Sequence, residues 1–288
     1  MADAIGPDPQ NRNPERGGTV LETYDDIRQA LVSGPKGQQQ SAPVEPRPAA
    51  NATRPASPYR PTARPPVPIL TVFDDGKFDG EVIRLREPKF VIGRTEGDLR
   101  FPLDGRMSAR HVEITHQLVG GLHRWVLTDL QSTHGVFVRV SKTALADKAE
   151  FLVGNGRYRF DANQLDTAVT ADHVPSSPAT GRTQGWVEGS NPVRMPSLTE
   201  LLGHDIGNRI LLVKGEYWIG SDPTCHVSRP DDPFCEARHV RLYRSSKGIW
   251  QAEHSKTQNG LWLRMAQLNV DAMIQFQVGE QRFRLKVN

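Results

Sequence analysis

Short stretches in which apolar and polar side chains alternate occupy most of the chain from residue 69 onward. Residues 111–116, 124–130, 135–140 and 157–160 follow this pattern, and glycine, asparagine or aspartate interrupts it at short intervals. Alternation with a period of two is typical of half-buried strands, and frequent turn residues are typical of antiparallel sheets. The pattern therefore predicts an all-β fold of antiparallel β-sandwiches.

The strand-rich part of the chain is present twice. Four residues recur at a constant offset: Trp125 as Trp250, Gly135 as Gly260, Phe151 as Phe276, and Gly154 as Gly279. Such self-similarity indicates two copies of one structural unit. We expect two sandwiches in tandem, over residues 68–161 and 196–288, joined by a flexible linker over residues 162–195.

Residues 1–67 differ from the repeats in composition. Thr19 and Glu22 have the spacing of a helix capping box, and apolar residues follow at helical spacing, which predicts a short helix over residues 20–32. The region of residues 35–68 holds nine prolines between Pro43 and Pro68, interleaved with arginines. This composition favours an extended, disordered linker.

Charge and composition narrow the function classes. A net charge of +3 over 288 residues is too small to indicate a nucleic-acid or membrane partner, and no run approaches 18 apolar residues. The only cysteines, Cys225 and Cys235, have no metal-binding spacing, and no nucleophile–base pair or phosphate-cradling glycine loop is present. We expect a cytoplasmic protein that is not an enzyme and has no metal or cofactor.

Four motifs of the first copy stand in a fixed order. They are Ile-Gly-Arg at residues 92–94, Asp98-Leu99, Ser-x-x-His at residues 108–111, and Asp-Leu-Gln-Ser-Thr-His-Gly at residues 129–135. In this order and spacing they resemble the forkhead-associated (FHA) domain, a β-sandwich that binds phosphothreonine peptides. The resemblance covers about 90 residues per copy and implies a phosphothreonine-dependent adaptor in bacterial Ser/Thr kinase signalling. Its implied partners are a phosphothreonine-containing protein and a Ser/Thr kinase.

The resemblance also assigns roles to residues. Arg94 and Ser108 would grip the phosphate, and Thr133 would support the peptide, whereas His134 stands where the family usually has asparagine. Arg106 matches a position that in some members reads an acidic residue three places after the phosphothreonine. The remaining motif residues would be structural, namely Gly93, His111 and Gly135 in the first copy, and His239 and Gly260 in the second.

The chemistry of phosphate recognition is consistent with these residue types. A phosphothreonine carries about −1.5 to −2 charges and three acceptor oxygens. A planar guanidinium with a nearby hydroxyl suits such a group. The same residues could instead be structural: Arg94 could pair with Glu96 or Asp98 on the surface, and Ser108 could be a turn residue.

The second copy lacks these groups. Ser221 replaces Arg94, Glu236 replaces Ser108, and Gln258 replaces Thr133. A carboxylate beside a phosphate is repulsive, by about 4 kcal/mol per charge pair at 4 Å and an effective dielectric of 20. We expect this copy not to bind phosphothreonine and to contact proteins independently of phosphorylation.

The N-terminal region contains a candidate internal ligand. Thr23 is followed three residues later by Asp26, which is the spacing that Arg106 would read. We expect Thr23 to be a phosphorylation site whose segment folds back onto the first copy.

An alternative function for the whole chain is a phosphorylation-independent scaffold, in which a helix over residues 19–32 and the second copy recruit partners.

Overall fold

The computed structural model describes residues 18–22, 26, 67–73, 79–165, 194–203 and 205–287. The strands, in chain order, are β1 (Val20–Leu21), β2 (Ile69–Phe73), β3 (Gly80–Arg84), β4 (Lys89–Gly93), β5 (Leu99–Arg100), β6 (Val112–Val119), β7 (Leu122–Asp129), β8 (Val136–Ala144), β9 (Glu150–Val153), β10 (Gly156–Leu165), β11 (Arg194–Leu202), β12 (Asp205–Leu211), β13 (Glu216–Gly220), β14 (Val227–Ser228), β15 (Val240–Arg244), β16 (Trp250–His254), β17 (Leu261–Arg264), β18 (Gln267–Val270), β19 (Met273–Val278) and β20 (Gln281–Lys286). The all-β prediction is confirmed. Within the described ranges, no helix has the length and apolar character needed to cross a membrane.

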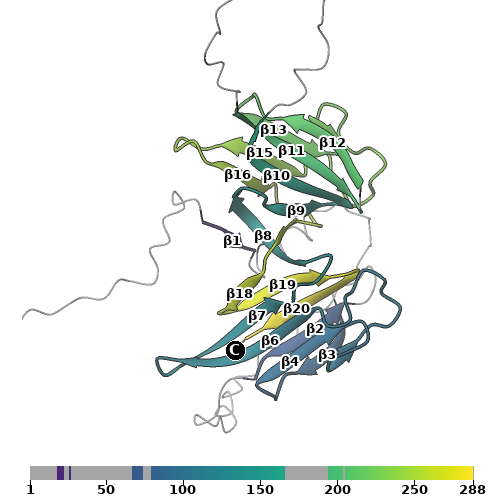
Figure 1. The fold of residues 1–288 in the computed structure, drawn as a ribbon, viewed down its shortest axis with the longest axis vertical. Helices are drawn as coiled ribbons and strands as arrows, with labels where there is room; N and C mark the ends of the chain where they lie inside the picture. Colours follow the sequence, from purple (N-terminus) through teal and green to yellow (C-terminus); the bar gives the residue numbers. More distant parts are fainter. Residues whose placement is uncertain are drawn as a thin grey trace, which may run out of the picture. The chain divides into compact units, whose positions relative to one another are not determined.

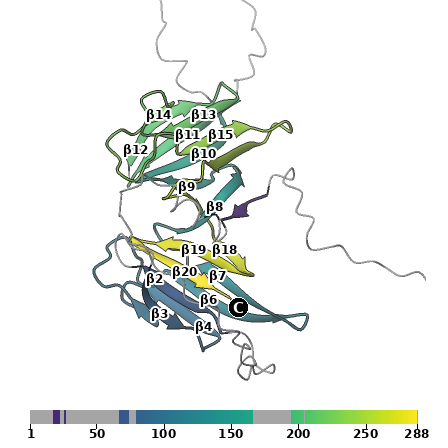
Figure 2. The same ribbon diagram turned by 180° about the vertical axis from the view of Figure 1, so that it is seen from behind.

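The chain forms two compact units, and each unit contains strands from both sequence copies. One unit combines the described residues of 23–136 with residues 265–287, and we call it the Arg94 unit. The other combines residues 18–22 with the described residues of 137–264, and we call it the Glu236 unit. Figures 1 and 2 show this exchange by colour, because the yellow C-terminal strands lie among the blue strands β2 to β4.

The Arg94 unit has two sheets. One has the strand order β18-β7-β6-β4-β5, in which β4, β6, β7 and β18 are antiparallel neighbours and β5 runs parallel to β4. In the other, β3 pairs with β2, β2 with β20, and β20 with β19, all antiparallel. Fully buried Ile92, Ile114, Phe276 and Phe283 contribute to the core. Phe276 stacks on Phe283 with ring centroids 5.0 Å apart.

In the Glu236 unit, β8 takes part in two runs of paired strands. Its first half pairs with β17, which continues through β9, β10 and β11 to β12. Its second half pairs with β16, which continues through β15 and β13 to β14. Fully buried Phe151, Phe160, Leu198 and Ile219 are part of its core.

The two units differ from the domain boundaries expected from the repeats. Residues 137–161, expected in the first sandwich, lie in the Glu236 unit, and residues 265–287, expected in the second sandwich, lie in the Arg94 unit. Both copies carry the same alternation in their last strands, so either copy can supply them. Local pattern determines that a strand forms but not which equivalent sheet it joins. The linker expected over residues 162–195 is also shorter, because β10 continues to Leu165, where it pairs with Arg194 of β11.

The predicted helix over residues 20–32 does not begin where expected. Val20–Leu21 is a strand that pairs with β8, and the Thr19 hydroxyl lies 2.8 Å from the hydroxyl of Thr143 instead of capping a helix. Glu22 is 3 % exposed and pairs with Arg139. At residues 20–22 the strand pairing and the ion pair take the place of helical structure, whereas Asp26, the one further described residue of the predicted range, is helical. Residues 23–25 and 27–66, with Thr23 and nearly all of the proline-rich linker, lie outside the described residues.

Candidate functional site

Arg94 directly follows β4, where the chain makes a close contact with the loop before β6. The backbone N–H of Arg94 donates to the carbonyl of Ser108 at 2.9 Å, and that of Glu96 donates to Ala109 at 3.0 Å. A Cβ atom on Gly93 would lie 2.2 Å from the Ala109 carbonyl oxygen, so the two loops can approach only with glycine there. The missing side chain of Gly93 thus lets the backbone of Arg94 pair with that of Ser108.

The Arg94 side chain is half-buried. Its Nε atom is shielded from solvent and has no hydrogen-bond partner among the described residues. Glu96 and Asp98 form no ion pair with it there; instead the Asp98 carboxylate accepts a hydrogen bond of 2.8 Å from the backbone N–H of Val91. The expected alternative of a surface ion pair with Glu96 or Asp98 is therefore not formed among the described residues, and the buried Nε remains a donor without a partner, which is costly.

His111 connects the two loops of the site. Its Nδ1 atom accepts the backbone N–H of Ser108 at 3.0 Å, and its Nε2 atom lies 3.1 Å from the carbonyl oxygen of Gly135. Since Nδ1 is an acceptor, the neutral ring carries its proton on Nε2 and donates it to Gly135. Burial lowers the pKa of His111, which favours this neutral form. His111 is completely buried, as suits a structural role.

The loop over residues 129–135 presents Thr133 next to Ser108. The backbone N–H of Thr133 donates to Ser108 Oγ at 3.2 Å, and Thr133 itself is exposed. The loop is held from inside, because Asp129 accepts the Ser132 N–H at 3.0 Å and Ser132 Oγ accepts the Gly135 N–H at 3.0 Å. Since Ser108 Oγ acts as an acceptor here, its own proton remains available for an anion.

Two further candidate residues lie in different surroundings. His134 is half-buried in the same loop as Thr133. Arg106 is exposed and forms an ion pair of 3.5 Å with Glu280, which precedes β20. Asp104 orients this region, since it accepts the backbone N–H groups of both Arg106 and Glu280, at 2.9 and 2.8 Å. The sequence analysis does not predict a role for Asp104, whose only sequence signal is its place in the turn-forming pair Asp104-Gly105.

The second copy keeps the loop geometry with different side chains. Glu236 donates its backbone N–H to His239 Nδ1 at 3.1 Å, and His239 Nε2 lies 2.9 Å from the carbonyl oxygen of Gly260, as in the first copy. Ser221 takes the place of Arg94, with its N–H donating to the Glu236 carbonyl at 2.9 Å. The Glu236 carboxylate accepts the Gln258 N–H at 2.6 Å, where the first copy uses the Ser108 hydroxyl. The Glu236 carboxylate thus has the place beside this loop that the Ser108 hydroxyl has in the first copy.

The arrangement in the first copy can hold an oxyanion by hydrogen bonds and charge. It combines a guanidinium with a buried unpaired nitrogen, a hydroxyl and an exposed threonine on adjacent loops. Across the described residues, no group of three or more His, Cys, Asp or Glu side chains is arranged to hold a metal ion. A guanidinium and a hydroxyl are donors that suit an oxyanion.

The fold and these loops define a β-sandwich recognition module, and comparison with known proteins identifies its family. A family model described as "FHA domain" matches residues 90–154, so this part of the chain is an FHA domain. The match extends past residue 136 and thus covers strands of both compact units.

Solved structures also resemble parts of the chain. One, the "Crystal Structure of Full-Length Yeast Pml1p", has 20% identity over 25% of this chain and 57% of that chain, with a TM-score of 0.24. Another, "Structural and functional analysis of phosphothreonine-dependent FHA domain interactions", has 31% identity over 32% of this chain and 91% of that chain, with a TM-score of 0.20. The chain therefore covers little more than half of the yeast protein. A comparison with curated proteins finds no match.

Proposed function

We propose that the chain is a phosphothreonine-dependent interaction adaptor that binds its partner through the loops around Arg94. The observation that carries the proposal is the buried Arg94 Nε, which has no hydrogen-bond partner among the described residues, on a residue whose backbone N–H is bonded to the carbonyl of Ser108. A phosphate group would accept from the Arg94 guanidinium and the Ser108 hydroxyl, and the exposed Thr133 would contact the peptide next to it. The FHA match over these residues supports the same function.

The partner would be a protein phosphorylated by a Ser/Thr kinase. An acidic residue three places after the phosphothreonine would compete with Glu280 for Arg106. Because Arg106 and Glu280 are both exposed, their ion pair is weak and can be exchanged at little cost. His134 would donate one hydrogen bond to the peptide backbone in place of the family's usual asparagine.

A degenerate phosphothreonine peptide library, screened against the full chain, tests the proposal and defines the preferred sequence. We expect Arg94→Ala to weaken the selected peptide by roughly 10- to 150-fold, since a hydrogen bond to a charged group contributes about 1.5–3 kcal/mol. Arg84→Ala, which removes an exposed arginine from β3, serves as the matched control and should leave the affinity unchanged. Selection of the same peptides by the Arg94→Ala chain would contradict the proposal.

We also propose Thr23 as a phosphorylation site that supplies an intramolecular ligand. A tethered ligand has an effective concentration near the millimolar range, so it would exclude weak external peptides. The library peptide should therefore bind the Thr23-phosphorylated chain at least about tenfold more weakly than the unphosphorylated chain. Equal affinity of the two forms would rule out the internal ligand, without affecting the proposal that Arg94 binds phosphothreonine.

One observation favours a second function, in which the Glu236 unit recruits a protein regardless of phosphorylation. The Glu236 carboxylate already caps the loop that would face a phosphate, while the scaffold around His239 is retained. Capture of a partner by this route would survive Arg94→Ala and dephosphorylation of the partner. Capture through the Arg94 loops would be lost in both cases.

A further inference from the structure

A buried polar cluster lies in the Glu236 unit, formed by β8, the end of β16 and the loop after it. Arg139 is 2 % exposed, and its Nη2 atom donates to the carbonyl oxygen of Thr257 at 3.1 Å. Its guanidinium also lies over the ring of Trp262, 5.9 Å from the ring centroid. His254, the last residue of β16, is 7 % exposed, and its Nδ1 atom accepts the Thr257 N–H at 3.1 Å. The cluster therefore contains a guanidinium and an imidazole whose Nδ1 is an acceptor, so that the neutral ring carries its proton on Nε2.

The cluster differs from the matching part of the first copy because an imidazole replaces a loop carboxylate. In the first copy Asp129 accepts the N–H of Ser132. At the matching positions the second copy has His254 and Thr257, and the imidazole makes the same contact with the backbone. The loop is thus closed as before, but it no longer has a negative charge inside. A buried guanidinium without a carboxylate partner is strongly unfavourable.

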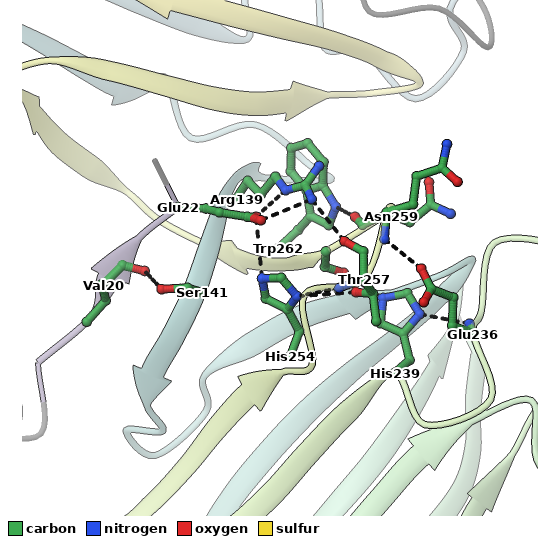
Figure 3. Close-up of polar contacts among 12 residues, drawn as sticks. Val20, Glu22, Arg139, Ser141, Glu236, His239, His254, Thr257, Asn259 and Trp262 are labelled. Carbon is green, nitrogen blue, oxygen red and sulfur yellow. Dashed lines mark hydrogen bonds and ion pairs between the residues drawn. The ribbon is translucent and has the colours of Figure 1, made fainter. Parts of the chain in front are cut away.

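The missing carboxylate comes from the N-terminal segment. Glu22 accepts from Arg139 Nε and, at 3.2 Å, from Nη2, and it lies 3.4 Å from His254 Nε2 (Figure 3). Burial raises the pKa of the Glu22 carboxyl, but the polar contact with His254 and the charge of Arg139 outweigh it and lower the pKa below its usual range. Glu22 is therefore ionised at neutral pH.

The segment around Glu22 is otherwise attached by few contacts. Strand β1 has two residues and an irregular register against β8, and Ser141 Oγ donates to the Val20 carbonyl at 3.3 Å. Val20 is 47% exposed, Thr19 is exposed and Leu21 is half-buried, so Glu22 is the one buried side chain of residues 18–22. A strand added to a sheet by backbone pairing and one anchoring side chain is the mode in which many peptides bind to sheets.

We propose that the second copy retains a binding site for an extended, glutamate-bearing peptide, and that the chain's own residues 18–22 are its ligand. The Glu22 carboxylate is the specific anchor and the pairing of β1 with β8 fixes the direction of the segment. Residues 18–22 are thus a docked, releasable ligand and not an integral strand of the Glu236 unit. This site recognises a carboxylate and does not depend on phosphothreonine.

The test uses the full chain and a fluorescein-labelled peptide of residues 16–26. The wild-type chain should not change the anisotropy of the peptide, because its own segment fills the site at high effective concentration. Glu22→Lys places an ammonium group against Arg139 and should release the segment, so this chain should bind the peptide saturably. A peptide carrying Glu22→Gln should bind about 10- to 150-fold more weakly, as expected for loss of a charged acceptor.

Glu216→Lys is the matched control chain. Glu216 is also a carboxylate of this unit paired with an arginine, Arg241, but that pair is exposed. The control chain should not bind the labelled peptide and should leave its anisotropy unchanged. Hydrogen exchange over residues 139–143 should rise in the Glu22→Lys chain and fall again when the peptide is added. The proposal is overturned if the Glu22→Lys chain ignores the peptide, or if it loses the near-ultraviolet circular dichroism of the folded state, because residues 18–22 would then be an integral strand.

Discussion

His111 and His239 are the residues that the two sequence copies use in the same way. Each accepts a backbone N–H through Nδ1 and contacts a glycine carbonyl through Nε2, so each joins two loops from inside the protein. Protonation of Nδ1 would break the first of these contacts. Both rings must therefore stay neutral for the loops to keep their geometry.

Acid should destabilise the protein through these two histidines. Burial lowers the pKa of both. An unfolded histidine titrates near pH 6.5, so below that value the unfolded chain binds protons that the folded chain does not bind. The free energy of unfolding should fall from pH 6.5 downward, by at most about 1.4 kcal/mol per histidine for each pH unit, until the folded pKa is reached.

Urea unfolding at pH 7.5 and pH 5.5 measures this dependence. The double variant His111→Gln, His239→Gln should lose less stability between the two pH values than the wild type does. His226→Gln, which removes an exposed histidine, provides the control and should keep the wild-type dependence. An unchanged pH dependence in the double variant would show that the buried imidazoles are not responsible.

At the scale of elements, the sequence predicts strands well and their partners poorly. The alternating segments at residues 111–116, 124–130, 135–140 and 157–160 lie mostly in β6, β7, β8 and β10, because alternation reflects which side of a strand is buried. The motif residues that need a particular backbone were also recognisable, since Gly93 leaves no room for a side chain. The sheet that β8 and β10 join could not be predicted from the sequence, because the equivalent strands β17 and β20 have the same pattern.

The N-terminal segment shows the limit of local signals. Thr19 and Glu22 have capping-box spacing, yet Glu22 forms a buried ion pair with Arg139, which is distant in the sequence. A cap contributes about 1 kcal/mol, whereas breaking a buried ion pair costs about 3–5 kcal/mol. The replacement of Asp129 by His254 in the second copy was the only sequence signal for the buried cluster around Arg139. It becomes informative only once the loops are superimposed in space.

At the scale of the whole molecule, exchange of strands between the copies makes each unit depend on both halves of the chain. The Arg94 unit needs β18, β19 and β20, and the Glu236 unit needs β8, β9 and β10. A chain cut between residues 166 and 193 would therefore supply each unit with strands from both pieces. In a simple tandem arrangement, each piece would instead hold one complete sandwich.

A protease site inserted between residues 166 and 193 distinguishes these arrangements. After cleavage, the two pieces should co-elute in gel filtration and appear as one complex in native mass spectrometry. They should separate only in denaturant, because separation would expose the apolar faces of both units. Two folded pieces that elute apart without denaturant would contradict the exchange of strands.

The central claim is that one guanidinium, that of Arg94, reads a phosphate on threonine. Isothermal titration of the full chain with the library-selected peptide, in its phosphorylated and unmodified forms, tests it most directly. We predict saturable binding of the phosphorylated form alone, with affinity reduced roughly 10- to 150-fold by Arg94→Ala. Equal affinity for the two peptides, or an affinity that Arg94→Ala leaves unchanged, would contradict the account.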